Sequence, residues 1–204
     1  MSSVSLTRLG ALAAVLSGAL WVVSELLYLI PSLRENTPEV ATSGSYLFQN
    51  TLLLLGGVLL LGGLVGLYAR HLENLGVLGM AGFLVAFVGT ALAVGSMWTS
   101  TFAIPAVAEQ APAALKAGPP PILLFANIVS WGGLTVGWLM LGVAILQSGV
   151  YPRLIAILLA VGALILFVPV PFSSLPFAVA VAWMGVLSLG SGGGTSIEQP
   201  SRVR

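Results

Sequence analysis

Four long apolar runs decide what this 204-residue chain can fold into. A helix needs about 20 apolar residues to cross a bilayer core that is about 30 Å thick. Runs of this length cover residues 9–30, 46–68, 78–102 and 122–146, and prolines or charged residues separate them. The sequence therefore predicts four transmembrane helices in these ranges.

A fifth apolar stretch, residues 154–189, is too long for a single crossing. Three prolines interrupt it: Pro169, Pro171 and Pro176. We expect a helical hairpin there, with helices over 152–168 and 173–189 and a tight turn between them. The whole prediction is an all-α transmembrane bundle of six helices.

The bundle is predicted to occupy residues 1–189 as one domain. The remaining segment, 190–204, reads GSGGGTSIEQPSRVR and has no apolar face. Such a composition cannot bury enough apolar surface to fold, so we expect a disordered cytoplasmic tail.

The composition agrees with a membrane protein and excludes several kinds of chemistry. Hydrophobic residues make up 58% of the chain and charged residues 6%, whereas soluble domains carry about 25% charged residues. The chain has no Cys, no Asp, one His and one Lys. Zinc sites built on cysteine, iron–sulfur clusters, disulfides and thiol nucleophiles are therefore excluded. No HExxH or GxxxxGK[ST] motif is present, and we expect no metal, no cofactor and no enzymatic activity.

The positive charges predict the orientation in the membrane, because cytoplasmic loops are enriched in Lys and Arg. With six helices and a cytoplasmic N-terminus, one side holds five arginines: Arg8, Arg70, Arg153, Arg202 and Arg204. The other side holds only Arg34 and Lys116. We therefore predict a multi-pass protein of the bacterial cytoplasmic (inner) membrane with both termini in the cytoplasm.

Small residues recur at helical spacing and predict close helix packing. The run 46–68 contains Gly62 and Gly66, and the run 122–146 contains Gly133 and Gly137, each pair forming a GxxxG. The run 78–102 carries a small-residue stripe: Gly82, Ala86, Gly89 and Ala93. Such residues let helix backbones approach closely in lipid, either within this chain or between two copies of it.

Glu25 is the ionisable residue most clearly placed inside a predicted helix, where it shares a face with Trp21 and Tyr28. Four more residues fall at a similar depth in the outer half of the bundle: Asn50, Trp98, Asn127 and Trp131. An acid inside a membrane usually has a partner or lines a wet cavity. Glu25 is therefore either a structural hydrogen-bond partner of Asn50 or Asn127, or part of an outward-opening pocket for a small amphipathic or lipid-like ligand.

Basic residues also mark the inner side of the predicted bundle. Arg70 and His71 end the second helix, and Arg153 follows Pro152 before the fifth. Their long side chains can reach lipid phosphates, so we expect contacts to lipid headgroups.

Two segments carry a resemblance to a group of proteins. They are LMLGVAILQSGVYPRLIAILLAVGALIL, residues 139–166, and GLYARHLENLGVLGMAGFLVAFVGTAL, residues 66–92. Each resembles the unit of helix, short basic turn and helix that occurs in uncharacterised bacterial polytopic integral membrane proteins of the domain-of-unknown-function type. The resemblance implies an inner-membrane protein and carries no catalytic residues.

Three functional hypotheses follow. The leading one is a non-enzymatic membrane subunit that binds a small ligand or lipid, or that assists other membrane subunits. We expect the lipid bilayer as its partner and no binding to nucleic acid. The alternative is a small proton-coupled transporter that uses Glu25. The third is an intramembrane enzyme with Glu25 as its general acid, which lacks an obvious second titratable group.

Overall fold

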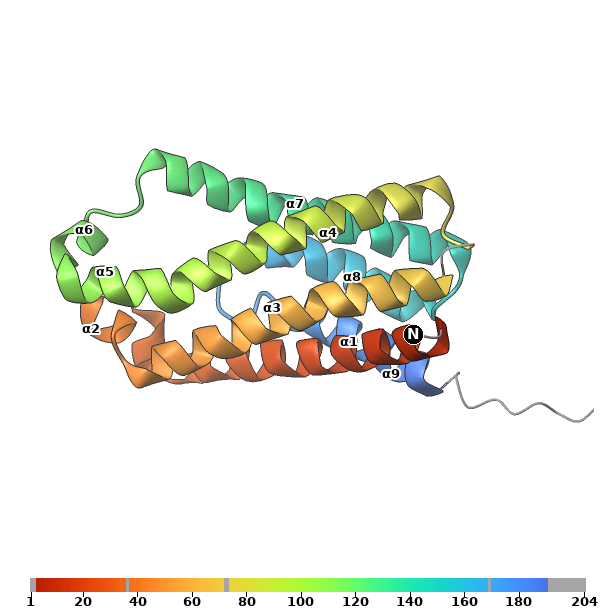
Figure 1. The fold of residues 1–204 in the computed structure, drawn as a ribbon, viewed down its shortest axis with the longest axis horizontal. Helices are drawn as coiled ribbons and strands as arrows, with labels where there is room; N and C mark the ends of the chain where they lie inside the picture. Colours follow the sequence, from red (N-terminus) through yellow and green to blue (C-terminus); the bar gives the residue numbers. More distant parts are fainter. Residues whose placement is uncertain (1–2, 36, 72–73, 169, 191–204) are drawn as a thin grey trace, which may run out of the picture.

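The computed structural model describes residues 3–35, 37–71, 74–168 and 170–190, and in these ranges the chain forms an all-α bundle without β-strands. Figure 1 shows long helices packed side by side, with short helices gathered at one end. The fold class predicted from the sequence is confirmed.

Four helical segments are long and apolar enough to cross a membrane. They are α1 (Ser3–Leu26) with the 3₁₀ turn η1 (Leu27–Leu29), α3 (Gly44–His71), α4 (Gly76–Trp98) with its continuation, and α7 (Pro121–Ser148). Each contains most of one predicted apolar run. The four predicted spans are therefore present as helices of the required length.

The sequence predicted that the third of these segments ends at Phe102, but the helix continues beyond it. A π-helical turn, η3 (Thr99–Ala103), joins α4 to α5 (Ile104–Gln110), so that one helical segment runs from residue 76 to 110. Pro105 has no backbone N–H to donate to the preceding turn. A wider π turn directly before it lets the helix continue without that hydrogen bond.

The predicted hairpin is present as α8 (Arg153–Leu166) and α9 (Leu175–Gly190). At 1.5 Å per residue these helices are about 21 Å and 24 Å long, which is shorter than a full crossing. In Figure 1 both lie in the part of the bundle that contains the N-terminus of α1. That each of them crosses the membrane completely stays a prediction.

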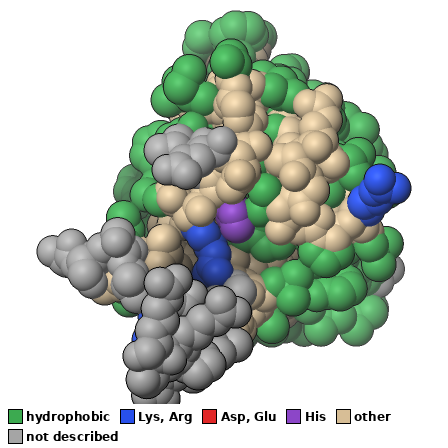
Figure 2. Space-filling view, turned by 90° about the vertical axis from the view of Figure 1, so that its right-hand side faces the viewer, with side chains coloured by type: hydrophobic (Ala, Val, Ile, Leu, Met, Phe, Trp, Pro, Cys, Tyr) green, Lys and Arg blue, Asp and Glu red, His purple; other side chains and the backbone are tan. Residues whose placement is uncertain are grey.

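The bundle has two different ends. The first, here called the basic end, contains Arg8 near the start of α1, Arg70 in the last turn of α3 and Arg153 at the start of α8. The second, here called the capped end, is covered by η2 (Pro31–Arg34), α2 (Pro38–Ala41), α5 and α6 (Pro112–Lys116). The acidic residues that the structure describes lie elsewhere than at the basic end, and Figure 2, which views this end, shows no acidic side chain.

Small residues bring the helix backbones together inside the chain. A Cβ atom added to Gly137 of α7 would lie 2.1 Å from the backbone nitrogen of Ala86 in α4. One added to Gly66 of α3 would lie 2.4 Å from the Cα atom of Gly10 in α1. These stripes therefore form contacts within the bundle, as packing of small residues in lipid requires.

The predicted disordered tail lies outside the described residues, apart from Gly190, which ends α9.

Candidate functional site

Glu25 is buried near the end of α1 and contacts the connection between α8 and α9. Its Oε2 atom accepts a hydrogen bond from the backbone N–H of Phe172 at 2.7 Å, and its Oε1 atom accepts one from the Ser174 hydroxyl at 2.5 Å. The side chain is 8% exposed. The prediction that Glu25 bonds to Asn50 or Asn127 is therefore wrong, because Phe172 and Ser174 donate to its two carboxylate oxygens instead.

The neighbours of Glu25 on α1 bind to α3 rather than lining a cavity. Trp21 is 1% exposed and donates from its indole nitrogen to the carbonyl of Leu53 at 3.1 Å. Ser24 and Gln49 each donate a side-chain hydrogen bond to the other's backbone carbonyl, both at 3.1 Å. Tyr28 lies next to Glu25 and Gln49. These contacts fix how α1 and α3 pack against each other.

The two asparagines of the predicted cluster lie on other interfaces. Asn50 donates to the carbonyl of Tyr46 within α3, and its own carbonyl accepts from the Thr101 hydroxyl of the π turn at 3.2 Å. Asn127 is exposed on α7 and accepts a hydrogen bond from the Ser96 hydroxyl of α4 at 2.7 Å.

The remaining tryptophans of the cluster are also separate from Glu25. Trp98 is 55% exposed and packs beside Phe102, with ring centroids 5.6 Å apart. Trp131 is half-buried and packs against the core. The seven predicted residues are thus dispersed over several contacts, with Glu25 at the α8–α9 connection, and they line neither of the pockets described below.

A different polar cluster lies at the basic end. The Nε2 atom of His71 is 3.1 Å from the Tyr151 hydroxyl, which is 2.7 Å from the Ser188 hydroxyl. Arg70 donates to the backbone carbonyl of Ser188. This carbonyl lies in the last turn of α9, where helix carbonyls lack intrahelical partners and attract cations.

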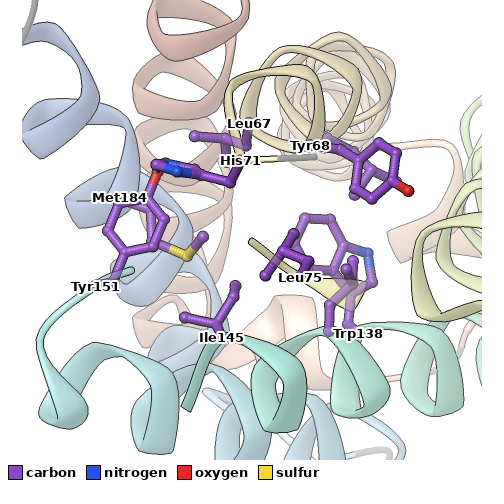
Figure 3. A pocket seen from close by; sticks show the side chains of 10 residues that line it. Leu67, Tyr68, His71, Leu75, Trp138, Ile145, Tyr151 and Met184 are labelled. Atoms are coloured by element: carbon purple, nitrogen blue, oxygen red, sulfur yellow. The ribbon is translucent and has the colours of Figure 1, made fainter. Parts of the chain in front are cut away.

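This basic-end cluster, defined here as Arg70, His71, Tyr151 and Ser188, stands at one side of an apolar pocket. Figure 3 shows His71 and Tyr151 facing each other beside Met184, with Trp138 and Leu75 across the pocket. The pocket lies between α3, α7 and α9 and has a volume of about 20 Å³. That volume is enough for about one water molecule, so the helices are nearly closed around it.

A second pocket lies on the outside of the bundle, between α1, α3 and Phe87 of α4. It is a shallow apolar groove of about 390 Å³, and Gly10 and Gly62 form part of its floor. It contains no ionisable side chain and therefore offers no chemistry beyond apolar contact.

The sequence named two residues of the basic-end cluster, as lipid headgroup contacts, and it missed the other two and the hydrogen bonds that join them. Arg70 and His71 were expected to contact headgroups, and both lie at this end. Tyr151 stands in the basic turn before Arg153, and that position was its only signal. Ser188 comes from a helix far along the chain, and no local pattern distinguishes it from other serines.

Arg153 has an exposed side chain at the first position of α8. The preceding residue, Pro152, supplies the carbonyl that accepts from the N–H of Ile155 and so begins the helix. Arg153 thus lies at the basic end, and its contact with a lipid headgroup stays a prediction.

Burial raises the pKa of the Tyr151 hydroxyl above its ordinary value of 10.0, against smaller lowering effects of the Ser188 hydrogen bond and of Arg70. The hydroxyl is therefore protonated at neutral pH. Among the described residues no group of three His, Cys, Asp or Glu side chains is placed to hold a metal ion.

Comparisons with protein-family models, curated proteins and solved structures give no match to this chain. The resemblance to polytopic bacterial membrane proteins stays an expectation.

Proposed function

We propose that this chain is a non-enzymatic, multi-pass protein of the bacterial cytoplasmic membrane that binds an anionic phospholipid headgroup at its basic end. Four helices of sufficient length and apolarity support a membrane location. The arginines at one end support a cytoplasmic position for that end and for both termini.

The observation that carries the proposal is the basic-end cluster. A guanidinium, an imidazole and two hydroxyls lie together there. Guanidinium groups bind phosphate through paired hydrogen bonds. The buried Tyr151 and Ser188 hydroxyls hold His71 in place beside the guanidinium. Figure 2 shows the single His next to a basic side chain on the surface of this end.

The apolar pocket limits which part of a lipid is bound. Its volume of about 20 Å³ is too small for an acyl chain. The headgroup is therefore the recognised part, and the acyl chains stay among the other lipids of the leaflet. Arg8 and the exposed Arg153 add two more positive charges at the same end.

The test compares two lipids and two matched variants. Delipidated protein in detergent receives phosphatidylglycerol or phosphatidylcholine, and its thermal unfolding is measured. A ligand at 100 times its Kd stabilises a protein by about 2.7 kcal/mol, which corresponds to about 5–10 °C for a chain of this size. We expect this shift with phosphatidylglycerol only.

Arg70→Gln is expected to abolish most of the shift, because it removes the positive charge from the cluster. Lys116→Gln is the matched control, since it removes a positive charge at the capped end. Equal shifts with both lipids, or a full shift in Arg70→Gln, would show that the cluster does not bind a headgroup.

The transporter and enzyme hypotheses both require Glu25 to exchange protons with a substrate or a water path. Its burial and its two occupied oxygens favour a structural role instead. We expect no proton-coupled flux above that of empty vesicles when either the wild type or Glu25→Gln is reconstituted into liposomes. A pH-dependent flux of the wild type that Glu25→Gln abolishes would favour the transporter.

A further inference from the structure

The connection between α8 and α9 is tied to the bundle by a side chain from the opposite end of the sequence. Glu25 accepts from both Phe172 and Ser174, and 147 and 149 residues of chain separate these pairs. A buried carboxylate is costly unless hydrogen bonds compensate it. The burial of the Glu25 carboxylate therefore depends on these two donors, and Glu25 in turn attaches the segment 170–174 to α1.

This segment contains an unfavourable backbone conformation. Phe172 has a φ of 68°, and the described residues include no other non-glycine residue with a positive φ. Bulky L-residues rarely adopt the left-handed region, and such conformations persist only where the surroundings impose them. The hydrogen bond from the Phe172 N–H to Glu25 is a contact that imposes it.

The structure on the α9 side of the segment is tightly packed. Phe177 lies between Trp21 and Trp138, with ring centroids 5.6 Å and 5.1 Å away. A Cβ atom added to Gly162 of α8 would lie 2.5 Å from the Phe177 backbone nitrogen. The first turn of α9 is therefore fixed by packing.

On its other side the segment lies at the surface of the bundle. Val170 and Pro171 are exposed, whereas Ser173 and Ser174 are buried, at 9% and 3% exposure. A change of conformation at Phe172 would thus move the exposed residues and uncover the two serines, while α9 stays in place.

We infer that Glu25 is a conformational latch that holds residues 170–174 in the conformation in which Ser173 and Ser174 are buried, against the strain at Phe172. Engaged, the latch keeps both serines buried. Released, the segment relaxes at Phe172 and the serines become accessible. The inference does not rest on the proposed headgroup site, since the two lie on different parts of the bundle.

The absence of native cysteines allows a direct test in the full-length protein reconstituted into liposomes. Ser173→Cys reports on the latch, and Lys116→Cys on the exposed α6 is the reference position. The rate of maleimide labelling is measured in the wild-type, Glu25→Gln and Glu25→Ala backgrounds. We expect labelling at position 173 to be at least about tenfold faster with Glu25→Ala and intermediate with Glu25→Gln, which keeps one acceptor. The rate at position 116 should not change.

A second variant separates a latch from a general loss of stability. Phe172→Gly removes the conformational strain, so adding it to Glu25→Ala should slow labelling at position 173 again. Equal rates at position 173 with and without Glu25 would overturn the inference. Faster labelling at both positions, or no effect of Phe172→Gly, would also overturn it, because Glu25 would then stabilise the whole fold.

Discussion

The α4–α7 interface and the start of α9 are held in two different ways. In the first, Ala86 and Gly89 of α4 meet Gly133 and Gly137 of α7 backbone to backbone, through several equivalent contacts. At the start of α9, one carboxylate from α1 makes two directed hydrogen bonds to a strained segment. The first region depends on the absence of side chains, and the second depends on the presence of one.

The largest effect is expected where a side chain is forced into the α4–α7 interface. Gly137→Leu places its Cβ atom against the backbone of Ala86, which cannot move without separating the helices. We expect a loss of about 3 kcal/mol or more in the free energy of unfolding, since overpacking costs about 1–3 kcal/mol even where side chains can adjust. Unfolding in mixed detergent and SDS measures it. Gly95→Leu is the control, because nothing lies within 4 Å of its Cβ position; equal losses in both variants would remove the distinction between the two regions.

A smaller effect is expected within the GxxxG of α3, where the two glycines are not equivalent. A Cβ atom at Gly66 meets Gly10 at 2.4 Å, whereas one at Gly62 lies 3.6 Å from the Cβ atom of Ala13. Gly66→Ala should lower the free energy of unfolding by about 1–3 kcal/mol. Gly62→Ala should change it by less than about 1 kcal/mol, with a gain in helix propensity. The same unfolding assay decides this, and a larger loss in Gly62→Ala would contradict the packing described.

A polar contact also crosses the α4–α7 interface. The indole nitrogen of Trp138 donates to the Thr90 hydroxyl at 3.0 Å, and Thr90 is fully buried. Thr90→Val keeps the shape and leaves the indole N–H without its acceptor, at an expected cost of about 1–2 kcal/mol. A double-mutant cycle with Trp138→Phe should give a coupling energy of about 1 kcal/mol. Zero coupling would mean that packing alone holds this interface.

The smallest effect concerns the pH dependence at Tyr151. Because burial raises the pKa of its hydroxyl above 10.0 in the folded protein, the folded state binds this proton more tightly than the unfolded state. The resulting stability is complete below pH 10 and is lost as the pH rises through the raised value. We expect the stability difference between wild type and Tyr151→Phe to be constant from pH 7 to about 9 and to decrease above about 10. A change already between pH 7 and 8 would contradict the burial of this hydroxyl.

The same comparison explains what the sequence could and could not predict. Small residues that recur every three or four positions are visible in one helix, so the stripe Gly82 to Ala93 correctly indicated close packing. The partners of Glu25 could not be found in this way. They lie 147 and 149 residues away, and only the folded chain brings them together.

Two further differences have local causes. A proline after an apolar run usually ends a helix, and the sequence therefore placed a loop after Phe102. The π turn at Thr99–Ala103 made continuation possible. The sequence grouped seven polar and aromatic residues by their depth in the membrane. Depth does not determine which helices are neighbours, and the structure places these residues in separate contacts.

The proposed function depends most on the bundle crossing a membrane with its basic end in the cytoplasm. Arg153→Cys and Lys116→Cys, each alone in this cysteine-free chain, place one thiol at each end of the bundle. Labelling with a membrane-impermeant maleimide is measured in intact cells and in inside-out vesicles. We expect position 116 to react in intact cells and position 153 to react only in inside-out vesicles. Reaction of both positions from the same side would contradict it.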